Sequence, residues 1–495
     1  MPQAYAELQD RFARIANVEG ALAVLSWDAS VVMPKGGAEG RGEQTAVLKR
    51  FAHDLVTAPD LPDLLARAAD EELDDWQRAN LAEMVRRHGQ ATATPPELVE
   101  AMARATTACE MIWRDARANN RFAELRPSLE EVVRLVREQA QALAATQGLS
   151  PYDALLDLYE AGLRDATIEP IFDRLGAELP TISTAALARQ GQPLEPKGPF
   201  PVDRQRALGT ELMTAIGFDF DEGRLDESAH PFSGGIPGDV RITTRYTEDS
   251  FLQAIMGVLH ETGHALYTAG QPKAWRHQPV GDARGMIVHE SQSLFMEMQA
   301  SRSQPFVAYL AARARAAFGR DDDPALSAAN LGLLVNHVAK GFIRVDADET
   351  TYPLHIVLRW RLEKAMIEGR LAVADLPEAW NEGMRELLGI VPPDDRQGCL
   401  QDIHWPVGAF GYFPCYTLGA LMAAQLFRAM LQEIPDAHAQ LGQGSFREIL
   451  PWLRRNIHEQ GCRYTYDELL RRVTGEELGP EAFLDHLRAR YLSGG

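Results

Sequence analysis

Apolar residues recur every three to four positions along most of this chain, and that spacing places them on one face of an α-helix. The pattern predicts helices over 5–27, 41–55, 60–87, 96–119, 124–145, 167–189 and 203–217. It resumes at 286 and continues to the C-terminus, with a break at 391–396. In contrast, the stretch from Gly238 to Tyr246 alternates and is rich in β-branched residues, which predicts a strand. We therefore expect a mainly α fold with a small β-element.

The length of the chain would allow about three domains. However, no long linker rich in serine, glycine and proline, and no low-complexity tract, divides its 495 residues. We therefore expect one large helical domain over 1–495. The polar, proline-containing stretch 190–201 indicates two tentative lobes on either side of a cleft. The first, 1–190, would be a helical wall or lid, and the second, 200–495, would be the catalytic lobe.

The strongest chemical signal is His260-Glu261-Thr262-Gly263-His264, an H-E-x-x-H sequence. The apolar positions around it predict a helix with Thr247 as its N-cap and Gly270 as its end. Two histidines four residues apart lie on one helix face and can bind one Zn²⁺, and the glutamate between them can act as general base. The alternative is a chance match on a buried helix with two core histidines.

A catalytic zinc site needs a third protein ligand and an open position for water. The residues after His264 do not continue as H-x-x-G-x-x-H, so a carboxylate on a later helix is expected. Glu290 is the first candidate, because the stretch from Gly270 to Gly285 can turn the chain back. Its alternative role is that of an ordinary solvated glutamate. Glu297 lies on nearly the same helix face and is the reserve ligand, or else an acceptor for a ligand histidine.

The predicted strand ends shortly before the H-E-x-x-H helix, so it should lie beside that helix. An extended edge near the metal would be able to hold the backbone of a bound peptide by strand-like hydrogen bonds. A short structural hairpin is the alternative, and the sequence does not choose between the two.

Further motifs occur in the same order as those of a known family. They are His230-Pro231-Phe232, Asp239-Val240-Arg241-Ile242-Thr243, His289-Glu290-Ser291-Gln292-Ser293, Ile343-Arg344-Val345-Asp346-Ala347-Asp348-Glu349, Gly398-Cys399-Leu400-Gln401-Asp402-Ile403-His404-Trp405 and Phe410-Gly411-Tyr412-Phe413-Pro414. Together with the H-E-x-x-H sequence, they make nearly the whole chain resemble the carboxypeptidase Taq family of zinc metallocarboxypeptidases. The resemblance implies an almost all-helical fold with a deep active-site cleft, one catalytic divalent metal, removal of single residues from peptide C-termini, and a homodimer.

The resemblance and the candidate ligands agree on hydrolysis by an activated water. Zn²⁺, with Co²⁺ as a substitute, would be held by His260, His264 and Glu290, one ion per chain, and would lower the pKa of its bound water. Glu261 would take the proton of that water and deliver it to the leaving amine.

Other side chains are expected to meet the substrate. A tyrosine hydroxyl should stabilise the negative oxygen of the tetrahedral intermediate, with Tyr416 favoured and Tyr412 as the alternate. A carboxypeptidase must also bind the free α-carboxylate of its peptide, which requires a cation in a partly closed pocket. Arg344 is the first candidate for that cation, and His230 is the second.

The remaining polar residues of the motifs have less defined roles. His404 would either orient the substrate or pack beside the metal. Arg241 is a further candidate for substrate binding. Asp402 is a candidate to buttress a zinc-binding histidine.

Two other functions stay open. An oligopeptidase would use the same zinc site in a cleft that is open at both ends. A non-catalytic, metal-stabilised binding scaffold would have lost a ligand or the base, and none is missing here. The candidate cations favour the carboxypeptidase.

Composition indicates the partners and the cellular location to expect. A formal charge of −20 argues against nucleic acid or an anionic membrane as partner. Four cysteines without C-x-x-C spacing indicate no disulfide framework, and the N-terminus carries charge where a signal peptide needs an apolar core. No apolar run approaches the roughly 20 residues that span a bilayer. We therefore expect a cytoplasmic enzyme that acts on peptides with a free C-terminus.

Overall fold

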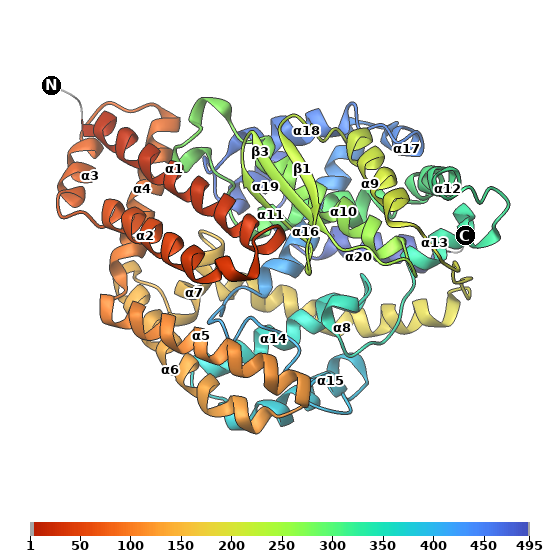
Figure 1. Ribbon diagram of the computed structural model, residues 1–495, viewed down its shortest axis with the longest axis horizontal. Helices are drawn as coiled ribbons and strands as arrows, with labels where there is room; N and C mark the ends of the chain where they lie inside the picture. The colour runs from red at the N-terminus through yellow and green to blue at the C-terminus, as the bar shows by residue number, and fades with distance from the viewer. Residues whose placement is uncertain (1–3, 494–495) are drawn as a thin grey trace.

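The computed structural model describes residues 4–493. Within that range the chain forms twenty α-helices and a small three-stranded sheet (Figure 1). This confirms the prediction of a mainly α fold with a small β-element. In this part of the chain, no helix combines the length and the apolar character needed to cross a membrane.

Nine helices precede the sheet. They are α1 (Ala4–Val31), α2 (Ala38–Val56), α3 (Leu61–Ala69), α4 (Asp75–Ala93), α5 (Pro96–Asn119), α6 (Phe122–Gln147), α7 (Pro151–Tyr159), α8 (Asp165–Arg189) and α9 (Val202–Ile216). The prediction of one helix over 60–87 is wrong. The Asp74 side chain accepts from the Gln77 N–H and the Gln77 side chain accepts from the Asp74 N–H, both at 2.9 Å, so a capping box starts a new helix there. The hydrophobic pattern also misses α7.

The sheet has the strand order β1-β3-β2, with β1 (Gly223–Glu227) parallel and β2 (Phe232–Ile236) antiparallel to the central β3 (Asp239–Thr244). β3 packs against the H-E-x-x-H helix, as predicted. Both of its edges are paired, however, so the hypothesis that this strand offers a free edge to a peptide is wrong. The β2–β3 pair matches the structural hairpin that was the alternative.

Eleven helices follow the sheet. They are α10 (Leu252–Ala269), α11 (Met286–Leu294), α12 (Gln304–Phe318), α13 (Ala328–Val335), α14 (Tyr352–Ile367), α15 (Leu376–Leu388), α16 (Pro414–Glu433), α17 (Ala437–Gly442), α18 (Ile449–Asn456), α19 (Tyr466–Thr474) and α20 (Glu481–Tyr491). α11 continues directly into a π-helix, η4 (Phe295–Ser301).

α10 begins four residues later than the sequence predicts. Phe251 is its N-cap residue and is buried at 1% exposure, whereas Thr247 lies outside the helix and donates its hydroxyl to the Ser250 carbonyl at 3.3 Å. Thr247 is therefore not the N-cap, because burial of Phe251 sets the helix start. The predicted end at Gly270, the C-cap residue, is confirmed.

Two glycines let α11 lie tightly between α10 and α16. A Cβ added at Gly263 of α10 would lie 2.4 Å from the Gln292 carbonyl oxygen and 2.6 Å from the Ser293 Cα. A Cβ added at Gly419 of α16 would lie 2.7 Å from the Glu290 Cβ. Each contact is closer than real Cβ atoms allow, so these two positions fix how near the three helices approach.

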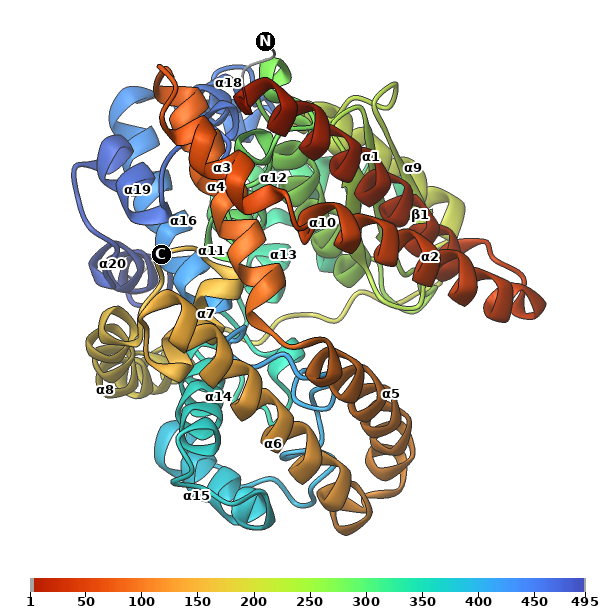
Figure 2. The ribbon, with the colours of Figure 1, turned by 90° about the vertical axis from the view of Figure 1, so that its left-hand side faces the viewer.

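The described residues form one main core and two smaller clusters. The main core draws buried side chains from Cys109 to Leu487, and a separate cluster joins α1, α3 and α4. Figure 2 shows α5, α6, α14 and α15 at one end of the molecule, with α1, α9 and α10 towards the other. The main core includes residues from both sides of 190–201, and the division into two lobes stays a prediction.

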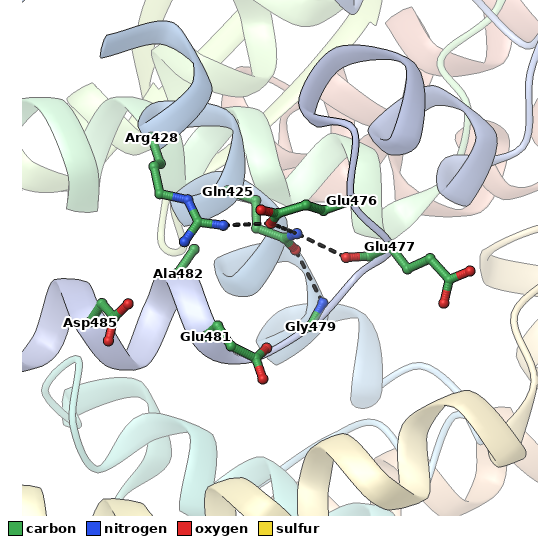
Figure 3. Close-up of a pocket in the computed structure, with 8 residues that line it drawn as sticks. All are labelled: Gln425, Arg428, Glu476, Glu477, Gly479, Glu481, Ala482 and Asp485. Carbon is green, nitrogen blue, oxygen red and sulfur yellow. Dashed lines mark hydrogen bonds and ion pairs between the residues drawn. The ribbon is translucent and has the colours of Figure 1, made fainter. Parts of the chain in front are cut away.

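The C-terminal helices α19 and α20 pack against α16, and Figure 3 shows side chains from this region. There the Gln425 side chain donates to the Glu477 carbonyl at 2.9 Å and accepts from the Gly479 N–H at 3.2 Å. Arg428 donates to the Glu476 carboxylate at 2.5 Å. These contacts tie the link between α19 and α20 to the helix that carries Gly419.

Two long stretches in the second half lie outside the α-helices, 336–351 and 389–413. The prediction of continuous helix with a break only at 391–396 is therefore wrong. Prolines and glycines explain the longer break. Pro392 and Pro393 interrupt the pattern. Gly411 adopts φ 86°, and a Cβ added there would lie 2.9 Å from the Leu155 carbonyl carbon.

A buried carboxyl group holds the second of these stretches. Glu363 of α14 accepts from the Tyr152 hydroxyl at 2.7 Å, and from the Trp405 Nε1–H and the Gly411 N–H at 3.2 Å each. Glu363 is fully buried. Burial raises the pKa of Glu363 to about 7, although the three donors lower it.

Replacing Gly263 tests whether α10 and α11 approach each other as closely as these contacts indicate. Gly263→Ala should lower the free energy of unfolding by about 1–3 kcal/mol, because an overpacked interface must shift. Gly257→Ala is the matched control on the same helix, since an added Cβ there meets no atom within 4 Å. It should leave stability unchanged or raise it by up to about 1 kcal/mol. Equal effects in urea titrations of the two variants would contradict the packing argument.

Glu363→Gln tests the buried carboxyl group. The unfolded chain loses this proton near pH 4.5 but the folded protein only near pH 7, so the parent loses stability as pH rises between these values. Glutamine does not titrate, and the variant should therefore gain relative to the parent by up to about 3 kcal/mol between pH 5 and pH 8. The measurement is the free energy of unfolding of both proteins at the two pH values. Parallel pH profiles would show that Glu363 keeps an ordinary pKa.

Candidate metal centre

Three side chains from two helices converge at the centre of the molecule. His260 and His264 lie on one face of α10, and Glu290 projects from α11. The Glu290 Oε2 atom is 3.3 Å from the His264 Nε2 and 3.9 Å from the His260 Nε2, and the three donor atoms all lie within 4.8 Å of one another. Ligands around a tetrahedral Zn²⁺ lie about 3.3 Å apart. Two imidazoles and one carboxylate in this arrangement could hold a divalent cation.

The other ring nitrogens of both histidines are held as well. The His260 Nδ1 is 2.9 Å from the Glu297 Oε2, and Glu297 in turn accepts from the Arg302 guanidinium at 2.6 Å. The His264 Nδ1 is 2.6 Å from the Nδ1 of His289, so one of these two nitrogens donates to the other. These contacts fix the ring orientations and turn both Nε2 atoms towards Glu290. Glu297 thus lies where an acceptor for a ligand histidine is expected, outside the converging donors.

The carboxylates give this cluster a strong preference for positive charge. Burial lowers the pKa of His260, but its hydrogen bond to Glu297 and the charge of Glu290 raise it to about 10. Glu261 lies next to the ligands, is 8% exposed, and has its pKa raised by burial against the opposing effect of both histidines. Side-chain exposures of 23% for His260 and 12% for His264 show that solvent reaches the ligands.

Two tyrosines from the start of α16 and the residues before it stand beside the ligands. Tyr416 lies one turn before Gly419, which contacts Glu290, and its ring meets that of Tyr412 edge-on at 5.2 Å. Burial raises the pKa of both phenols, and the nearby Glu290 carboxylate adds to the effect. Both hydroxyls are therefore protonated and able to donate.

Next to Tyr416 lies a buried pair of arginines that share one carboxylate. Arg344 donates from its Nε and Nη2 to the Asp402 Oδ1 at 3.0 and 2.9 Å, and Arg359 donates from its Nε to the Asp402 Oδ2 at 2.7 Å. The Arg344 Cζ is 5.0 Å from the centre of the Tyr416 ring. Two cations facing one anion leave an excess positive charge. The hypothesis that Asp402 buttresses a zinc-binding histidine is wrong, because both of its oxygens are bonded to arginines.

Arg344 keeps donors to spare. Its Nη1 donates to the Tyr352 hydroxyl at 2.8 Å, so three of the five guanidinium N–H groups are used and two remain, one on each terminal nitrogen. Those two form the fork that matches a carboxylate. Sequence reasoning missed Tyr352 and Arg359. The buried helix that carries them shows no motif that would single them out.

The other candidate residues lie at different distances from the converging donors of His260, His264 and Glu290. The His404 Nε2 is 3.2 Å from the Tyr416 hydroxyl, and burial lowers the pKa of His404 to about 4, so it is neutral at pH 7. Arg241 is paired with Asp239 at 2.9 Å, and its Cζ lies 4.3 Å from the centre of the Trp27 ring of α1. His230 is exposed in the link between β1 and β2. Among the described residues, Arg241 contacts the sheet and α1.

The cysteines take no part in this chemistry. All four are free thiols and are buried, and Cys415 fills space at the start of α16. This agrees with the expectation that no disulfide framework is present.

Known proteins share both this sequence and this fold. The family model for carboxypeptidase Taq (M32) metallopeptidases matches residues 7–491. Thermostable carboxypeptidase 1 of Thermus thermophilus is 40% identical over 98% of this chain and 97% of its own length. Metallocarboxypeptidase 1 of Trypanosoma cruzi has a solved structure that superposes with a TM-score of 0.97, at 41% identity and 99% coverage of both chains. An M32 carboxypeptidase from Deinococcus radiodurans superposes with a TM-score of 0.94 at 33% identity, covering 99% of this chain and 98% of its own.

Proposed function

This chain belongs to the carboxypeptidase Taq (M32) metallopeptidase family, and we propose that it releases single residues from peptide C-termini at a zinc centre. Membership makes it a peptide hydrolase and confirms the resemblance found in the sequence. One observation supports the finer proposal most strongly. The donors of His260, His264 and Glu290 converge, and α16 connects them to the buried Arg344. Its Tyr416 ring lies 5.0 Å from the Arg344 Cζ, and its Gly419 packs on Glu290 one turn later.

The cation site supplies the hydrolytic chemistry. A Zn²⁺ ion bound there, or Co²⁺ in its place, would lower the pKa of a coordinated water and polarise the scissile carbonyl. Glu261 is placed next to the ligands and would accept the proton of the attacking water, then pass it to the leaving amine. Glu297 and His289 would hold the two imidazoles in orientation while the reaction proceeds.

A phenol would stabilise the developing negative oxygen. Tyr416 is favoured because it lies between Glu290 and Arg344, and its protonated hydroxyl can turn from His404 to the substrate. Tyr412 packs against it and is the alternate. His404 is neutral and would accept from Tyr416 in the absence of substrate, which keeps that hydroxyl near the reaction.

The anion site supplies the specificity for a chain end. The free N–H groups of Arg344 would pair with the α-carboxylate of the substrate, and that charge would balance the excess positive charge of the Arg344–Asp402–Arg359 cluster. This argument favours a carboxypeptidase over an oligopeptidase, which has no need for a buried cation of this kind. A non-catalytic scaffold has no need for Glu261. Arg241 lies on β3 and His230 lies in the link between β1 and β2, and both would meet only parts of the peptide farther from the scissile bond.

The setting of the enzyme rests on the resemblance and the composition. We propose a cytoplasmic homodimer that acts on peptides and on neither nucleic acid nor membranes. A mass near 54.8 kDa in light scattering, rather than about twice that value, would contradict the dimer.

Glu261→Gln should bind metal like the parent but lose about 10²- to 10⁴-fold in kcat, because an amide cannot accept the proton of the attacking water. Glu290→Ala is the matched comparison and should lose the metal itself. The measurements are single-turnover rates on a free-acid peptide and elemental analysis of each protein after dialysis. A Glu261→Gln variant within about tenfold of the parent would mean that Glu261 is not the base.

Arg344→Met should lose about 2–4 kcal/mol of transition-state stabilisation on free-acid peptides, because it removes a charged contact and keeps the side-chain stem. The parent should cleave a C-terminally amidated peptide poorly, and the variant should discriminate less between acid and amide. Mass spectrometry of digests over time, with and without chelator, reads out both. If the parent cuts amides as fast as acids, or cuts internally without releasing single residues, the oligopeptidase replaces this proposal.

A further inference from the structure

A buried glutamate far from the H-E-x-x-H sequence reaches the helix that carries Glu290. Glu160 is the C-cap residue of α7 and is 0% exposed. Its Oε2 accepts from the Ile287 N–H at 2.9 Å and the Val288 N–H at 3.4 Å. Its Oε1 has no hydrogen-bond partner among the described residues. Both hydrogen bonds of this carboxylate therefore go to the first turn of α11.

α11 lacks a cap of its own at this end. Its N-cap residue is Gly285, which has no side chain to accept from the first N–H groups of the helix. A Cβ added at Gly285 would lie 2.4 Å from the Glu160 Oε1 and 2.5 Å from its Oε2. Glu160 thus fills the place of the missing cap from another helix, and its carboxyl group lies at the positive end of α11.

The cap lies next to the ligand along the helix. Ile287 and Val288 directly precede His289 and Glu290, so the capped N–H groups belong to the same turn that presents the ligand carboxylate. Gly263 and Gly419 restrain α11 farther along, at Gln292 and at Glu290 itself. The N-terminal end of α11 is therefore held by Glu160 and the later turns by α10 and α16.

Stability alone is a weak reason for such a group. A carboxylate without a cation in hydrogen-bond contact is expensive to bury, and a buried charge seldom stabilises a fold more than apolar packing does. Glu160 instead fixes the orientation of α11, because its bonds to two N–H donors on one turn define how that helix is rotated about its axis.

We propose that Glu160 is a positioning residue that sets the rotation and the start of α11 and so holds Glu290 in place for metal binding. The proposal rests on the proposed function for the identity of the ligand, but not for the contact between Glu160 and α11. Glu160 acts through the helix and touches neither metal nor substrate.

The test compares Glu160→Ala and Glu160→Gln with Ser150→Ala. Ser150 caps α7 itself by accepting from the Asp153 N–H at 3.1 Å, so its loss weakens the same helix without touching α11. Two readouts are needed on the folded full chain, the dissociation constant for Zn²⁺ in competition with a chelator and the amide hydrogen exchange of residues 286–294. Neither readout depends on turnover.

Glu160→Ala should raise the zinc dissociation constant by about 10- to 100-fold, the usual loss for groups that orient a ligand, and should speed exchange in 286–294. Glu160→Gln keeps one acceptor oxygen without the charge and should fall between Glu160→Ala and the parent. Ser150→Ala should change both readouts by less than about twofold. If Glu160→Ala does not fold, the same criteria apply to Glu160→Gln.

Zinc binding and exchange within about twofold of Ser150→Ala would overturn the proposal. Glu290→Ala separates this failure from failure of the proposed function. If Glu290→Ala loses zinc and the Glu160 variants do not, only the positioning role of Glu160 is rejected. If Glu290→Ala keeps zinc, the proposed ligand set is rejected. In that case, amide exchange in 286–294 that is unchanged in the Glu160 variants is enough to reject the positioning role.

Discussion

The close packing of α11 between α10 and α16 is the constraint on which the site depends. Gly263 on one side and Gly419 on the other let the backbone of α11 approach both neighbours, and any side chain at either position would push it away. The separation between the Glu290 carboxylate and the two imidazoles follows from this approach. Close-packed interiors have few intermediate arrangements, so the three donors are held at cation-binding distance by the core and not by the donors themselves.

The charged side chains near α11 form two groups, one rich in carboxylates and one that contains two arginines. Carboxylates surround the imidazoles on one side, with Glu297 held by Arg302, and on the other side Arg344 and Arg359 share Asp402. A peptide end carries its scissile carbonyl and its terminal carboxylate one residue apart. The first group suits a cation that would bind the carbonyl, and the second suits the carboxylate. Tyr416 contacts Arg344 of the second group and lies one turn before Gly419, which packs on Glu290 of the first group.

Local signals explain what the sequence could predict. The spacing of His260 and His264 defines a helix face, and the need for a third ligand after a turn points to Glu290. Contacts between distant segments could not be predicted in this way. Glu160 meets Ile287 and Arg359 meets Asp402 only because the tertiary fold brings them together.

Thr247 was a reasonable cap by residue type, but burial of Phe251 decides where α10 begins. The acidic stretch 70–74 contains no proline or glycine to mark a helix end, and only its capping box reveals the break. The strands β1 and β2 are short and largely half-exposed, which leaves little alternation to detect.

Anomalous X-ray scattering measured on both sides of the zinc absorption edge would test the metal centre most directly. For crystals grown with zinc, we expect one peak per chain, about 2.0–2.2 Å from the Nε2 atoms of His260 and His264 and from the Glu290 carboxylate. Glu261 and Glu297 should lie outside direct coordination. A peak bonded to Glu297 in place of Glu290, or an unchanged fold with no peak at these residues, would contradict the account.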